Sequence, residues 1–249
     1  MVEVATGRLS HEERGARGAW MARFCQLIGY ARCSTDEQDL TAQRDGLAET
    51  PRSGRRPTIA AMATTRRTDM FVDLKDDPRE NGPTLGDERT ALVEYLRCVR
   101  LTLEMKCSGL DAEALARRSV EPSTMSLLGL VRHLAEMERH AFRNVMARQE
   151  APRLFCSDTD RDGDFDGALP DPQVVAGAWD AWRAEVEFAE RFVAGSPSLD
   201  VTGKDRGGVG QGQGPISLRE VLLEMIHEYA RHLGHADLLR ERIDGRIGQ

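Results

Sequence analysis

Residues 217–245 read SLREVLLEMIHEYARHLGHADLLRERIDG, and this stretch decides the fold class. Glu220 follows Ser217 by three residues, which is the spacing of a helix capping box. Apolar residues then recur every three or four positions until Gly245, a residue type that commonly ends helices. The stretch therefore predicts one long amphipathic helix.

Three earlier segments show the same helical period. They are about 86–106, 123–145 and 171–194, with a short helical turn over 111–118. An Asp- and Gly-rich loop (158–167) and a Gly-rich loop (203–214) form the longer connections, and no credible strand lies between the helices. We expect an all-α fold, a four-helix bundle.

The first part of the chain has no sustained period. It ends in a linker over 50–57 that is rich in Pro, Gly and Arg. We expect residues 1–61 to be largely disordered and not independently folded, and residues 62–249 to contain the bundle. A family resemblance described below implies that the bundle begins near Met62, so an over-long gene model is the expectation for the residues before it.

The composition excludes several classes of protein. The net charge of -7 gives no electrostatic basis for binding nucleic acid or an anionic membrane. No run of residues is apolar enough for a spanning helix or a signal peptide, so a cytoplasmic location is expected. The five cysteines form no C-x-x-C pair and are expected to be reduced thiols. A homodimer is left open.

The last helix carries the strongest candidates for chemistry. On a helical wheel with Glu228 at zero, His232 falls at about 40°, inside the apolar stripe. Glu228 lies at the edge of that stripe, and His235 lies just beyond it. His227 points toward solvent. Glu228 and His232 are four residues apart, so they stand one above the other and can share one metal ion.

The second helix adds two residues. His133 lies on the flank of its apolar stripe, and Glu138 lies inside the stripe, where a carboxylate needs a buried partner. Glu138 is thus a candidate to orient a ligating histidine. Spacing alone leaves two interpretations open: histidines hydrogen-bonded in the core, or metal ligands.

Two segments carry a family resemblance. LLGLVRHLAE (127–136) and EYARHLGHADLLR (228–240) resemble the DinB/YfiT-like superfamily, and more narrowly its mini-circle protein branch. The resemblance covers about residues 66–247. It implies a four-helix bundle with one divalent metal, usually zinc or nickel, on three side chains that match His133, Glu228 and His232. A Glu followed by a His on the last helix is the pattern of the mycothiol-dependent branch.

The resemblance also implies a function. It indicates a transferase or isomerase that uses a low-molecular-weight thiol such as mycothiol, with the thiol and an electrophile as its small-molecule partners. Arg231, His235 and Arg240 are expected near the mouth of the bundle, where they would hold thiol carboxylates or move protons. The alternative is a metal-binding protein without catalytic turnover.

The N-terminal region resembles a different family. LIGYARCSTDEQDL (27–40) is similar to the start of a serine recombinase (resolvase) catalytic domain, in which Ser34 would be the nucleophile with Arg32 beside it. The similarity ends near Glu49, after one strand and part of a helix, which cannot bury a core. The segment is therefore interpreted as a remnant, and a DNA recombinase function is rejected.

Overall fold

The last helix of the chain, α8 (Leu218–Asp244), begins and ends where the sequence predicts. The Glu220 carboxylate accepts a hydrogen bond from the Ser217 N–H at 2.8 Å, and the Ser217 hydroxyl accepts one from the Glu220 N–H at 3.3 Å. Gly245 follows the helix at φ 74°, a left-handed conformation that glycine adopts without steric cost. The predicted capping box and helix end are both confirmed.

The computed structural model describes residues 71–83, 85–205, 207, 209 and 214–248. These residues fall in the unit Phe71–Gln249. The expectations for residues 1–61, including the boundary at Met62, the disorder and the roles of Arg32 and Ser34, lie outside the described residues.

Three other long helices precede α8. They are α3 (Glu88–Cys107), α5 (Leu127–Glu138) and α7 (Pro172–Gly195). Side chains of Asp87, Ser126 and Asp171 cap their N-termini by accepting backbone N–H bonds. Shorter elements are η1 (Leu74–Asp76), η2 (Pro78–Asn81), α4 (Ala112–Ala116) and α6 (Gly163–Asp166).

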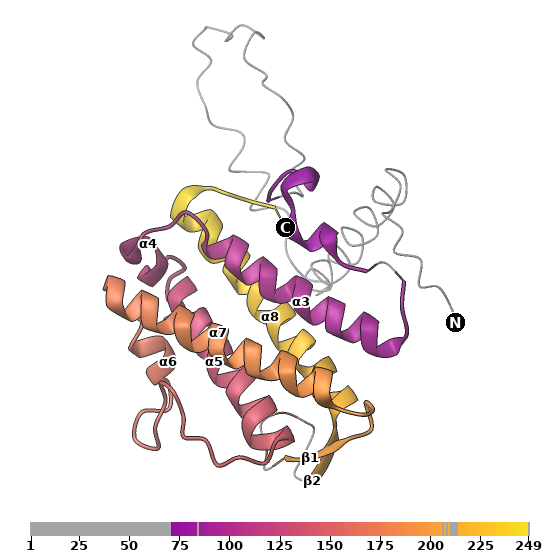
Figure 1. Cartoon of the computed structure of the whole chain (residues 1–249). Coiled ribbons are helices and arrows are strands. Elements are labelled where there is room, and N and C mark those ends of the chain that lie inside the picture. Colours follow the sequence, from indigo (N-terminus) through magenta and orange to yellow (C-terminus); the bar gives the residue numbers. More distant parts are fainter. Residues whose placement is uncertain (1–70, 84, 206, 208, 210–213, 249) are drawn as a thin grey trace, which may run out of the picture. The chain divides into compact units, whose positions relative to one another are not determined.

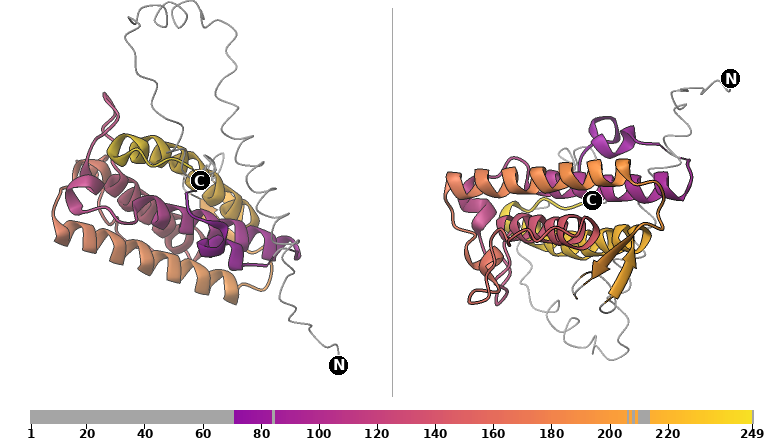
Figure 2. Two further views of the ribbon diagram at one scale, coloured as in Figure 1. Left: turned by 90° about the horizontal axis from the view of Figure 1, so that it is seen from above. Right: turned by 60° about the horizontal axis from the view of Figure 1, so that its bottom comes forward.

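The long helices pack lengthwise in pairs. Helix α3 lies along α8, and α5 lies along α7, while α8 also contacts α5 (Figures 1 and 2). Their apolar faces meet in one core that includes Leu130, Leu134, Trp182, Val221 and Met225. The described part of the chain is thus helix-rich, and its arrangement is compatible with the expected four-helix bundle. Among these helices, none combines the length and apolarity needed to cross a membrane.

The second long helix begins later than predicted, and it changes type before its predicted end. It begins at Leu127, not near Ser123, because the Ser126 hydroxyl accepts the Gly129 N–H at 3.1 Å and caps it. Beyond Glu138 it continues as the π-helical segment η3 (Arg139–Met146). The wider turn shows in the bond from Ala147 N–H to the Phe142 carbonyl, five residues back, at 2.9 Å.

The expectation of no strand between the helices is wrong for one connection. Strands β1 (Thr202–Asp205) and β2 (Gly214–Ser217) form an antiparallel pair in which Thr202 is opposite Ser217. Their Gly and Pro content hid them, since both residues are rare in strands. Gly203 is needed for contact with η3, because a Cβ there would lie 2.5 Å from the Val145 carbonyl oxygen.

Candidate metal centre

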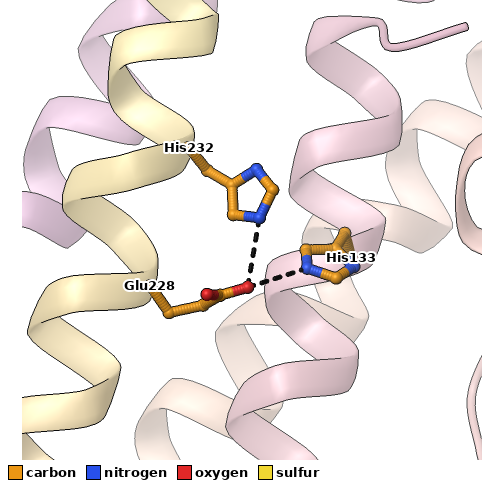
Figure 3. Close-up of side chains that lie close together, drawn as sticks. All are labelled: His133, Glu228 and His232. Carbon is orange, nitrogen blue, oxygen red and sulfur yellow. Dashed lines mark hydrogen bonds and ion pairs between the residues drawn. The ribbon is translucent and has the colours of Figure 1, made fainter. Parts of the chain in front are cut away.

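Helices α5 and α8 bring three potential ligands together. Figure 3 shows His133 on α5 pointing at Glu228 and His232 on α8. One Glu228 oxygen, Oε1, lies 3.1 Å from Nε2 of His133 and 3.1 Å from Nε2 of His232. The candidate ligand atoms of the three residues all lie within 4.8 Å of one another.

Helix geometry explains the convergence. Glu228 and His232 are one turn apart on α8, so their side chains project from the same face. His232 is buried, in accordance with its place inside the apolar stripe, and Glu228 is half-buried at the edge. His133, on the flank of the α5 stripe, faces α8 rather than open water.

The Glu228 carboxylate is strongly held in its charged form. Burial opposes ionisation, but hydrogen bonds from His133, His232 and Arg231 outweigh it and place the pKa of Glu228 far below its usual value. The contact with Arg231 is a short ion pair across one turn of α8. The carboxylate is therefore a permanent anion at neutral pH.

His133 is held from both sides of its ring. Its Nδ1 lies 2.7 Å from Oδ2 of Asp164, while its Nε2 faces Glu228. Burial disfavours the imidazolium, yet the hydrogen bonds to Asp164 and Glu228 outweigh this and raise the pKa of His133 to about 9. The same contact lowers the pKa of Asp164, against the effect of its burial.

Asp164 is the residue that the sequence reasoning missed. It lies in α6, within the loop that was read only as acidic and Gly-rich. Its neighbour Phe165 stacks on the His133 ring at 5.2 Å between centroids. Phe165 is the one apolar residue between positions 157 and 167, and this could have shown that the loop folds back onto a helix.

A family model described as mycothiol-S-transferase matches residues 91–245, which is more than half of the chain. The chain belongs to the mycothiol S-transferase family. This agrees with the resemblance to DinB/YfiT-like proteins. No curated protein and no solved structure matches.

The comparisons give no support for a serine recombinase fragment in the N-terminal region. The mycothiol S-transferase match begins at residue 91, downstream of the segment that carried that resemblance. The expected remnant at residues 1–61 therefore has no evidence behind it.

The three residues shared by α5 and α8 fit a divalent cation chemically. Two imidazoles and one carboxylate are the ligand types that zinc takes in catalytic sites with three protein ligands. The Asp164 carboxylate at Nδ1 of His133 is the kind of outer partner that orients a ligating histidine in such sites. In this mycothiol S-transferase family member, His133, Glu228 and His232 are the candidate metal ligands.

The neighbouring histidines and arginines of α8 separate into inner and outer groups. His235 lies 3.4 Å from His232, Nδ1 to Nδ1, beside the cluster but outside the ligand set. The side chain of His227 is 72% exposed, as the wheel predicted. Arg240, expected near the mouth, is instead buried, and it donates to the carbonyls of Lys106 and Ser108.

Glu138 has a buried partner, but its surroundings differ from those expected. Both of its oxygens accept from Arg100, at 2.7 Å each, and Oε1 also accepts from the Tyr229 hydroxyl at 2.9 Å. Trp182 in turn donates to the Tyr229 oxygen at 2.8 Å. Glu138 therefore does not orient His133; Asp164 holds that ring.

Proposed function

We propose that this chain is a metal-dependent enzyme of the DinB type, with its long helices forming a four-helix bundle. We further propose that it is a transferase or isomerase that uses a low-molecular-weight thiol of the mycothiol type as its co-substrate. The observation that carries this is the convergence of His133, Glu228 and His232 within 4.8 Å. Membership of the mycothiol S-transferase family supports the thiol.

The chemistry follows from the charges at the site. A divalent cation bound there supplies the Lewis acidity that makes a thiol lose its proton. His133 and His232 would direct Nε2 at it, and Asp164 keeps the proton of His133 on Nδ1. The anionic Glu228 would partly neutralise a cation held there.

The Arg231 guanidinium offers a positive charge that can bind the co-substrate. Its side chain is 55% exposed and remains next to the cluster through Glu228. An exposed guanidinium beside the site can bind a carboxylate of the thiol or of the electrophile in bidentate fashion. His235, half-buried beside His232, is placed to exchange protons with either molecule.

Several finer assignments belong to the same proposal. The metal is proposed to be zinc or nickel, and the partners a small-molecule thiol and an electrophile, with no nucleic acid and no membrane. The proposal also includes a cytoplasmic location and a domain boundary between residues 61 and 62. It leaves the choice between monomer and homodimer open.

Cobalt substitution tests the thiol step directly. Cobalt bound at the site should develop a near-ultraviolet charge-transfer band when mycothiol is added, because sulfur then ligates the metal. The band should be absent in Glu228→Ala and His232→Ala and retained in His227→Ala, whose side chain is exposed. Consumption of thiol with an electrophile should follow the same pattern.

A metal-binding protein without turnover is the second candidate. The observation that favours it is the crowding of Glu228, which already contacts His133, His232 and Arg231. Such a protein would bind cobalt stoichiometrically but show no sulfur band at millimolar thiol. That result would replace the transferase proposal with this one.

A further inference from the structure

Asp164 occupies a special place in the loop between η3 and α7. It is 4% exposed, whereas the other described carboxylates near it in the loop, including Asp162 and Asp166, are exposed or only partly covered. Oδ2 lies 2.7 Å from Nδ1 of His133, and Oδ1 accepts the Phe165 N–H at 3.0 Å. Both oxygens of this buried carboxylate are therefore committed, one of them to a candidate metal ligand.

The loop that carries Asp164 is fastened to α5 in the turn that precedes His133. One turn before it, Gly129 lets the loop approach, since a Cβ there would lie 2.8 Å from the Phe165 ring. Next to it, Arg132 donates to the carbonyls of Gly163 and Asp164 at 2.8 and 2.7 Å. The backbone around Asp164 is thus fixed relative to the helix that holds His133.

A second anchor lies upstream in the same loop. One oxygen of Glu136 accepts the N–H groups of Phe155 and Cys156, at 2.6 and 3.0 Å. The Arg132 guanidinium lies over the Phe155 ring at 4.0 Å. Two buried, charged side chains of α5 are therefore used to hold a loop that adds no metal ligand of its own.

There is a chemical reason to fix this loop against α5. A neutral imidazole carries its proton on either ring nitrogen, and only the other nitrogen can bind a metal. An acceptor fixed at Nδ1 keeps the proton there and leaves the Nε2 lone pair facing Glu228 and His232. His232 has no carboxylate at its Nδ1 among the described contacts; its neighbour there is His235.

We propose that Asp164 is the positioning residue of the metal centre and acts through His133. This rests on the proposed function, because it needs a metal at His133, Glu228 and His232. The alternative source of a carboxylate, Glu138, is excluded since Arg100 and Tyr229 occupy it.

The test is the affinity for Zn²⁺, measured by competition with a chromophoric chelator. Asp164→Asn should weaken binding by about 10- to 100-fold, and Asp164→Ala at least as much. Asp166→Asn is the matched control from the same loop: Asp166 is exposed and pairs only with Arg118, at 2.9 Å. It should leave the affinity within about twofold of wild type.

NMR of the zinc-loaded protein gives a second reading, and the wild-type half of it does not depend on a variant folding. His133 should bind zinc through Nε2 and carry a hydrogen-bonded proton on Nδ1, and in Asp164→Asn that proton should shift upfield. If wild type binds zinc and Asp164→Asn binds it with equal affinity, the inference is overturned and the proposed function is not. The same holds if Nδ1 of His133 is the zinc ligand. If wild type binds no zinc at all, the proposed function fails with it.

Discussion

Glu138 and Glu228 both lie on or beside the apolar face of a helix, and their surroundings differ. Glu138 is fully buried and its partners are Arg100 and Tyr229. Glu228, whose side chain is 16% exposed, faces the ring nitrogens of His133 and His232. The first is paired with a buried guanidinium that never loses its proton. The second has an exposed guanidinium, that of Arg231, and in addition two imidazoles that can lose theirs.

The difference distinguishes a structural cluster from a candidate metal centre. The Glu138 carboxylate is paired with the Arg100 guanidinium, so this cluster has no charge left to bind a ligand. Around Glu228 the imidazoles would give up protons to a divalent cation if one binds there, as metal binding by histidine requires. A buried carboxylate alone therefore does not indicate chemistry; the protonation behaviour of its partners decides.

The sharpest test of this contrast is metal content. His232→Ala should reduce bound metal from about one ion per chain to nearly none, because two ligands cannot hold a divalent ion against buffer. His227→Ala, on the same helix but exposed, should keep full occupancy. Elemental analysis of both purified proteins decides it. Full occupancy in a triple variant of His133, Glu228 and His232 would contradict the metal centre.

A second test removes the other glutamate. Glu138→Ala leaves Arg100 charged, buried and without its bidentate partner, which should lower the free energy of unfolding by about 3–5 kcal/mol. Urea denaturation measures this. Glu187→Ala, which breaks only an exposed ion pair with Arg191, should cost no more than about 0.5 kcal/mol. Equal effects of the two variants would show that the Glu138 pair is not the structural site.

The pH dependence of the metal-free protein is a third test. Because the folded pKa of His133 is raised to about 9 from an ordinary 6.5, its stabilisation is complete below that ordinary value and disappears as pH rises through about 9. Glu228 and Asp164, with lowered pKa values, add stability that is lost only in acid. The urea midpoint should therefore fall between about pH 6.5 and pH 9.

Two controls accompany that measurement. His133→Asn should flatten this part of the profile, and bound metal should remove it, since the ligating His133 is already deprotonated. The apparent metal affinity should rise over the same interval. A midpoint in the metal-free wild type that does not change across it would show that His133 is not held in its charged form.

The smallest effect is expected from removing residues 1–61, which lie outside the described residues. A chain that begins at Met62 should melt within about 5 °C of the full chain. Phe71→Ala gives the contrast: Phe71 is 1% exposed and the Arg246 guanidinium lies 3.7 Å over its ring, so its loss should cost about 3–5 kcal/mol. A larger drop on truncation would mean that the N-terminal segment packs on the helices.

Much of this fold could be predicted because its signals are local. The capping box at Ser217, the Asp171-Pro172 start and the three- to four-residue apolar period each depend on neighbouring residues. The π-helical segment η3 could not be predicted, since one wider turn leaves almost no trace in that period. Strands β1 and β2 were hidden because each is only four residues long and their composition is poor in strand formers.

The candidate site divides in the same way. Glu228 and His232 could be paired from the wheel because one helix fixes both, and the family resemblance added His133. Asp164 could not be found, because its contact with His133 depends on how a loop folds back onto α5. Glu138 illustrates the opposite error: its burial was predicted correctly, but the identity of its partner depended on α3, a helix distant in the sequence.

Glu228 and Tyr229 are consecutive residues of α8, and one faces the histidines while the other reaches Glu138. Side chains of adjacent residues on a helix point about 100° apart, so a rotation of α8 about its axis moves both at once. Helix α8 therefore cannot rotate to adjust the contact of Glu228 with the histidines without also displacing Tyr229 from Glu138. A metal ion bound between α5 and α8 would restrict rotation of α8 about its axis. The core amide protons around Tyr229 would then exchange with solvent more slowly.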